Sequence, residues 1–104
     1  MSPSQIDKLV AELLAVTRVG LGVVEVHQVL VLNHPDHAGY VEHGVFFDVR
    51  GSRFHLLVET DVEAAHVSAE LRLSIGGDLC TLELPTLAGV ELYAALAGVY
   101  HEED

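Results

Sequence analysis

Histidine is the residue type in this chain most suited to chemistry, since seven of the 104 residues are histidine. Imidazole changes charge near neutral pH and ligates metals, so it can act as a base, a ligand or a pH sensor. His34 and His37 lie on either side of Asp36, and two imidazoles with a carboxylate are zinc-binding groups. The spacing is not that of a closed zinc site, and no second pair of ligands stands nearby in the sequence. We interpret the segment as a solvated turn and expect no metal and no cofactor.

Asp48 and His55 form a candidate polar site, because the predicted strands place them side by side on one face. A carboxylate can hold an imidazole in one tautomer and so prepare it as a base. However, the chain has no phosphate-binding glycine loop, no nucleophile motif and no paired-cysteine motif. We interpret the two residues as an ordinary cross-strand polar pair and expect no catalytic residue. The sequence favours a binding protein over an enzyme, although a site assembled from distant residues leaves no motif.

The charge of the chain is strongly acidic, with 16 Asp and Glu against 5 Lys and Arg and a formal net charge of −11. Such a surface repels phosphate backbones and anionic lipids, so we expect no direct contact with nucleic acid or membrane. It attracts a basic or amphipathic protein partner. Arg50 and Arg53 lie at one predicted hairpin tip. They are either two solvated side chains that point apart or a candidate interaction site for an anion or an acidic partner group.

Cys80 is the only cysteine, which excludes an internal disulfide and indicates a reducing compartment. We place it on the apolar face of its strand, as a buried structural thiol. The first residues lack the basic start and apolar run of a signal peptide. No stretch reaches the roughly 20 apolar residues that a membrane span needs. We therefore expect a cytoplasmic protein.

The elements that must position these residues form one α+β domain over residues 1–104. Ser2, Pro3 and Gln5 have the types that begin a helix, and apolar residues at helical spacing continue it toward Gly20. A strand over residues 23–32 follows. One face of this strand is predicted to carry Val24, Val26, Leu30 and Leu32.

Two hairpins make up the rest of the predicted five-stranded, mainly antiparallel sheet. The first runs over residues 40–60 with a turn at Gly51-Ser52, which would pair Phe47 with Leu56. The second turns at Gly76-Gly77, which would pair Leu71 with Leu82.

A capping-box pattern lies between the two hairpins, where Thr60 and Glu63 have the required types and spacing. This pattern predicts a possible short helix that ends at about Ala65. The predicted sheet therefore has three strands before this segment and two strands after it.

The last helix is predicted to begin at Thr86, to reach about Tyr100 and to pack on the sheet. It is apolar almost all round, which is typical of a helix that is buried on more than one side. In so small a domain the second side is expected to face another subunit, so we predict a homodimer. The candidate interaction residues on this helix are Leu92, Tyr93, Leu96, Val99 and Tyr100.

Three function classes follow from these patterns. The first is a protein-binding adaptor or chaperone, since the element order and the acidity are similar to those of type III secretion chaperones. That resemblance implies a dimer that holds an extended segment of another protein. The second is an acidic inhibitor or immunity-type protein that blocks a basic partner with a stripe of Glu25, Glu42, Glu59 and Glu70. The third is a small-ligand binder or enzyme with a pocket that uses His27, His43 or His55.

Overall fold

The computed structural model describes residues 3–19, 23–33, 35–75 and 77–102. Helix α1 (Pro3–Val19) comes first and helix α2 (Thr86–Glu102) comes last. Between them lie five strands, which pair in chain order as one antiparallel sheet. The predicted α+β class, with a helix at each end of a five-stranded sheet, is confirmed. The strands are β1 (Val24–Asn33), β2 (Tyr40–Val49), β3 (Ser52–Asp61), β4 (His66–Ile75) and β5 (Asp78–Leu84).

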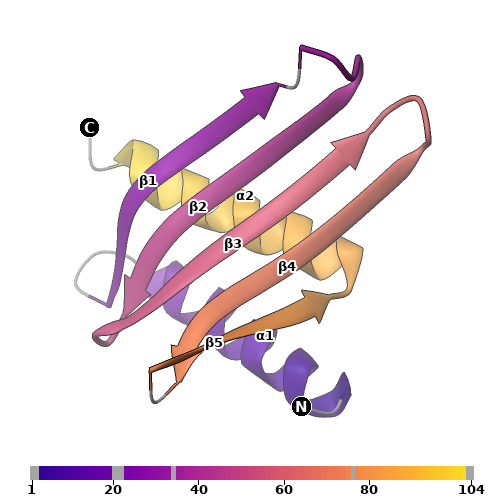
Figure 1. Cartoon of the computed structure of the whole chain (residues 1–104). Helices are drawn as coiled ribbons and strands as arrows, with labels where there is room; N and C mark the ends of the chain where they lie inside the picture. Colours follow the sequence, from indigo (N-terminus) through magenta and orange to yellow (C-terminus); the bar gives the residue numbers. More distant parts are fainter. Residues whose placement is uncertain (1–2, 20–22, 34, 76, 103–104) are drawn as a thin grey trace.

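Both helices lie behind the sheet in Figure 1, so they cover one face and leave the other face toward the viewer. Alternate side chains of each strand point to the covered face and meet the apolar stripes of the helices. In the part of the chain that the structure describes, no helix covers the opposite face. The largest fully buried side chains of the core are Phe47, Leu56, Leu71, Leu92 and Leu96.

The hairpin of β4 and β5 has the register that the sequence predicts. Leu71 pairs with Leu82, and Leu73 pairs with Cys80. Gly77, before β5, has φ +88°, and glycine adopts this left-handed conformation of a tight hairpin turn without steric cost.

The hairpin of β2 and β3 differs from its predicted register by two residues. The turn is Arg50-Gly51, with φ of 52° and 83° at these positions, and Phe47 pairs with Phe54 instead of Leu56. Two successive residues with positive φ fit the twist of a two-residue hairpin, so Arg50 adopts a conformation that its residue type does not indicate. A shift of two residues keeps every side chain on its predicted face, so the predicted faces are correct and the predicted partners are wrong.

Strand β1 contains a bulge that the alternation pattern does not reveal. Val26 pairs with Phe47, and Gln28 pairs with the preceding residue of β2, Phe46, so His27 is the extra residue. Beyond the bulge the two faces exchange. Val29 packs against the core, whereas Leu30 is on the opposite face, so the predicted shared face of Val24 and Leu30 is wrong.

The segment between β3 and β4 is a turn, so the predicted short helix is wrong. The Asp61 carboxylate accepts a hydrogen bond from the Ala64 amide at 3.2 Å. Ala65 has φ 52°, a left-handed conformation that does not continue a right-handed helix. Val62 is 77% exposed. The segment therefore has no apolar side with which a helix would pack, and a capping pattern alone does not stabilise one.

Helix α2 packs closely on β4 through Gly89. A Cβ atom added there would lie 2.2 Å from the Cβ of Ala69, so only glycine permits this approach. The buried stripe of the helix is Gly89, Leu92, Leu96 and Val99. Leu87 and Val90, on the other side, are exposed, so within this chain the helix is buried on one side only.

Candidate binding site on the open face of the sheet

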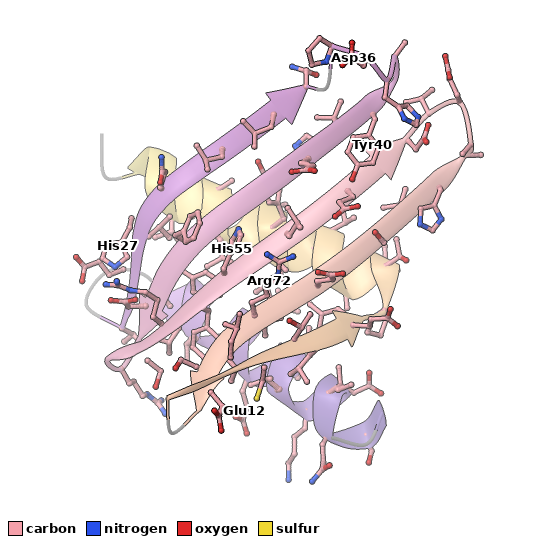
Figure 2. All side chains as sticks on the ribbon, in the orientation of Figure 1. Glu12, His27, Asp36, Tyr40, His55 and Arg72 are labelled. Carbon is pink, nitrogen blue, oxygen red and sulfur yellow. The ribbon has the colours of Figure 1, made fainter. Side chains whose placement is uncertain are left out.

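The face of the sheet that the helices leave uncovered, here called the open face, carries a mixture of apolar and charged side chains. Figure 2 views the molecule from this side, with Tyr40 toward one end of the sheet, His55 and Arg72 near its middle, and His27 beside β1. The central positions of the open face are Leu30, Gly44, Phe46, His55, Leu57 and Arg72.

The centre of the open face is a hollow of about 350 Å³ in which apolar side chains, Leu30, Leu32, Phe46 and Leu57, are bordered by Glu42, His55, Glu59 and Arg72. Leu57 lies opposite Gly44 in the register, and a Cβ atom at Gly44 would lie 3.4 Å from His55 Nε2 and 4.0 Å from the Cβ of Leu30. Although no helix covers this face, Leu57 is only 9% exposed, because its neighbours on the sheet surround it. The apolar side chains of the hollow form a recessed surface, which is the type of feature that receives an apolar side chain of a partner.

Carboxylates lie in opposed pairs beside this hollow. Glu42 pairs with Glu59 across β2 and β3, and Glu70 pairs with Glu83 across β4 and β5. Directly opposite like charges destabilise a sheet. The Tyr40 hydroxyl donates to Glu59 at 2.6 Å and lies 3.5 Å from Glu42, and this hydrogen bond together with burial raises the pKa of Tyr40 well above its usual value.

Three of the four glutamates of the predicted acidic stripe, Glu42, Glu59 and Glu70, therefore lie on adjoining strands of one face. Glu25 is at the far end of β1, opposite Asp48. We call the end of the open face that carries Tyr40, Glu42 and Glu59 the acidic end.

The opposite end of the open face carries basic residues. Arg53 and Arg72 are the only lysine or arginine residues within the five strands, and both line a second hollow of about 320 Å³ together with His55 and Leu79. Arg72 lies opposite His55 in the register. We call this region, defined by Arg53, His55 and Arg72, the basic end.

His55 stacks on Phe46, with ring centroids 4.0 Å apart and an interplanar angle of 9°. Burial, followed by the nearby Arg72 guanidinium, lowers the pKa of His55 below its usual value. The ring of His55 offers a flat surface that joins the two hollows, because both are lined by Phe46, His55 and Arg72.

The predicted pair of Asp48 and His55 does not form, because the actual register places Arg53 opposite Asp48. Asp48 accepts from Arg53 Nε at 3.1 Å, and its other oxygen lies 2.9 Å from His27 Nε2. The hydrogen bond from Arg53, and next that from His27, lower the pKa of Asp48. The signal that sequence reasoning missed is the bulge, which places His27 at this carboxylate.

Glu25, His27 and Asp48 bring three possible metal-ligand atoms within 4.8 Å of one another. The Arg53 guanidinium already occupies one oxygen of Asp48, and a fixed positive charge opposes a cation there. The geometry fits a hydrogen-bonded cluster of His27, Asp48 and Arg53 that connects β1, β2 and β3.

The other candidate histidines do not share a pocket. His37 Nε2 lies 3.1 Å from Asp61 on β3, and His34 is outside the described residues. His43 is on the covered face, where its ring meets that of Tyr93 at a centroid distance of 5.3 Å. His27 and His55 lie on different parts of the open face, so the described residues do not form a pocket with convergent histidines.

The candidate interaction residues of α2 are mostly part of the chain's own core. Leu92 and Leu96 are fully buried and Val99 is nearly so, which leaves these three unavailable to a partner. Tyr93 is partly buried against the core, and the side chain of Tyr100 is outside the described residues.

The two arginines of the predicted hairpin tip are separated. Arg50 is in the turn and exposed, whereas Arg53 is in β3 and forms the ion pair with Asp48. Cys80 lies on the covered face opposite Leu73 as predicted, but it is only partly buried.

Comparison with protein-family models, curated proteins and solved structures found no match. No family model, curated protein or solved structure therefore supports the expected similarity to type III secretion chaperones, and the segment between β3 and β4 lacks the short helix of the expected element order. Neither α1 nor α2 is long and apolar enough to cross a membrane, and this finding covers the described residues only.

Proposed function

We propose that this protein is a non-catalytic binding module that holds a basic, amphipathic helix of another protein on the open face of its sheet. The observation that carries the proposal is the open face itself, where a hollow lies beside opposed carboxylates. An antiparallel sheet can leave one face to solvent, but here that face has apolar side chains in a hollow at its centre. A partner helix would cover them, as α1 and α2 cover the other face.

The apolar part of the proposal rests on Leu57 and its surroundings. A side chain that is 9% exposed at the bottom of a hollow of about 350 Å³ can receive an apolar anchor residue with little rearrangement. Recessed apolar positions near the centre of an interface contribute most of the binding energy.

The charged part of the proposal rests on Glu42 and Glu59. Their opposition across the strands costs stability in the free protein. A lysine or arginine from a partner would relieve this repulsion on binding. Electrostatic attraction between a chain of net charge −11 and a basic segment would also speed association.

The same surface supports the alternative of an acidic inhibitor, because a basic partner that is held on the open face is also blocked there. The two roles differ in the consequence for the partner and not in the contacts. The third class, a His-lined pocket, has less support because His27, His43 and His55 do not converge.

A peptide titration followed by NMR tests the proposal directly. The probe is an amphipathic Leu/Lys helix of about 14 residues, long enough to span the roughly 20 Å between Arg53 and Glu59. We expect amide shift changes at Gly44, His55 and Leu57 and none at Val10 of α1. The same peptide with glutamate in place of lysine is expected not to bind. Shift changes confined to α1 and α2, or no binding of either peptide, would refute the proposal.

Two matched double variants separate the site from net charge. Glu42→Gln with Glu59→Gln removes the two opposed carboxylates, whereas Asp7→Asn with Glu12→Gln removes two exposed carboxylates of α1. Both variants change the net charge equally. We expect the first to weaken Leu/Lys peptide binding about tenfold and the second to change it by less than about twofold.

The homodimer and the cytoplasmic location stay part of the proposal. Val31 on β1 and Leu87 and Val90 on α2 are exposed apolar residues outside the open-face site, and they are available to a second copy. Light scattering is expected to give twice the chain mass of 11.2 kDa. A monomer at every concentration would refute the homodimer but not the proposed binding site on the open face.

The proposed cytoplasmic location rests on the single unpaired cysteine.

A further inference from the structure

The open face is unevenly charged along its strands: Glu42 and Glu59 lie near one end, and Arg53 and Arg72, each beside a carboxylate, lie toward the other. The acidic end and the basic end lie on the same strand, since Glu59 and Arg53 belong to β3, six residues and therefore about 20 Å apart. The hollow with Leu57 lies between them. A ligand that lies along this face meets carboxylates at one end and guanidinium groups at the other.

Each arginine of the basic end is paired with a carboxylate, so the formal charges there cancel, whereas the acidic end keeps the negative charge of Glu42 and Glu59. Arg53 uses Nε for Asp48, and Arg72 uses Nη2 for Glu70 at 3.2 Å. Each guanidinium has five N–H donors, so each retains donors for a ligand oxygen. Because each arginine already has a carboxylate beside it, the site suits a group with one negative charge or less, and a phosphate dianion would be repelled.

An α-helix has the matching polarity. Its N-terminus has a partial positive charge and its C-terminus has a partial negative charge with unsatisfied carbonyl oxygens. A helix that ends at the chain terminus adds a carboxylate to that negative end.

We propose that the open face orients its bound helix, with the helix C-terminus and its free carboxylate at Arg53, His55 and Arg72 and with its basic side chains at Glu42 and Glu59. This inference rests on the proposed function and specifies the partner: a C-terminal helix of a basic protein. His55 contributes a flat surface stacked on Phe46, and the two arginines contribute hydrogen-bond donors. The reverse orientation would place the helix carbonyls beside the two opposed glutamates.

The first experiment measures direction with a spin label attached to one end or the other of the Leu/Lys helix. A label at the C-terminal end is expected to broaden the amide signals of Arg53 and Ser74, and a label at the N-terminal end those of Tyr40 and Asp61. Broadening at both ends by either label would mean that the helix binds in both directions, which would overturn the orientation but not the proposed function. The absence of any binding would overturn the proposed function itself.

The second experiment compares a free C-terminal carboxylate with an amidated one. We expect the free acid to bind about threefold to tenfold more tightly. Arg53→Gln with Arg72→Gln is expected to abolish this preference, whereas Arg50→Gln, which removes an exposed charge from the turn outside the hollow, is expected to retain it. Equal affinities of both peptides for the native protein would refute the carboxylate site. An amidated peptide with an internal glutamate that regains the full affinity would show that a side chain is bound there instead.

Discussion

The two faces of the sheet are built from the same five strands but differ in which residue types lie opposite one another. On the covered face apolar side chains lie opposite one another, as Val45 and Leu56 do, and the core residues are almost completely buried. On the open face a glutamate lies opposite a glutamate in two places, and a buried leucine is surrounded by ionisable groups. Residue types that suit their position in the fold stabilise it, and residue types that do not suit their position are typical of functional surfaces. The covered face therefore holds the core that stabilises the fold, and the open face is the surface on which we propose that a partner binds.

The largest expected effect contrasts two neighbouring leucines of β3. Leu56 is fully buried on the covered face, and Leu57 is 9% exposed on the open face. We expect Leu56→Ala to lower the free energy of unfolding by about 2–5 kcal/mol, because it leaves a cavity that helices and sheet enclose. Leu57→Ala is expected to cost about 1 kcal/mol, since water can enter the space that it leaves. Urea unfolding measures both values, and equal losses would contradict the distinction between the faces.

A second contrast lies within α2, where two glycines have different surroundings. A Cβ at Gly89 would overlap Ala69 of β4, whereas a Cβ at Gly98 would meet nothing within 4 Å. We expect Gly89→Ala to destabilise the protein by about 1–3 kcal/mol through overpacking. Gly98→Ala is expected to stabilise it by about 0.5–1 kcal/mol, because alanine restricts the unfolded chain. If thermal unfolding showed both variants to be stabilised, the close contact of α2 with β4 would be wrong.

The sequence predicts the covered face better than the open face, for a physical reason. Apolar alternation determines which side chains are buried, and this signal assigned Leu71 and Leu82 to one face with the correct register. The turn at Arg50 was not predictable, because arginine is not a residue type that favours positive φ. A shift of two residues leaves the apolar pattern intact but changes every polar partner, so Asp48 meets Arg53 and not His55.

The bulge at His27 illustrates the same limit. Both faces of β1 are apolar enough that alternation gives no sign of an extra residue, yet the bulge moves Leu30 and Leu32 to the open face. The sequence shows that β3 and β4 each contain one arginine, but it is the register of the strands that places Arg53 and Arg72 in the same hollow. Functional geometry here depends on partners across strands, and single-strand patterns do not determine those partners.

The pH dependence of stability offers a contrast between two groups of the open face. Burial and Arg72 lower the pKa of His55, so below the unfolded value of about 6.5 the unfolded chain takes up a proton that the folded chain resists. Stability is therefore retained above about pH 6.5 and decreases as the pH falls toward the folded pKa of His55. The lowered pKa of Asp48 gives a loss in the same direction but only below about pH 4.

Urea unfolding at about pH 7.5 and about pH 5.5 distinguishes the contribution of His55 from those of the other histidines. We expect His55→Gln to reduce the difference in stability between these two conditions. His66→Gln, which changes an exposed histidine at the start of β4, is expected to leave the difference unchanged. An identical pH profile for His55→Gln and the native protein would show that His55 is protonated as readily in the folded chain as in the unfolded chain.

The smallest expected effect tests whether the opposed glutamates cost stability in the free protein. Glu83 lies opposite Glu70 at the β5 edge of the open face, and Glu70 also forms the ion pair with Arg72. Glu83→Gln keeps the shape and removes one of the like charges, so we expect it to stabilise the fold by a few tenths of a kcal/mol, and by more at low salt. Glu12→Gln on α1 is the control for net charge. If Glu83→Gln stabilised the protein no more than this control does, repulsion between the paired carboxylates would be negligible.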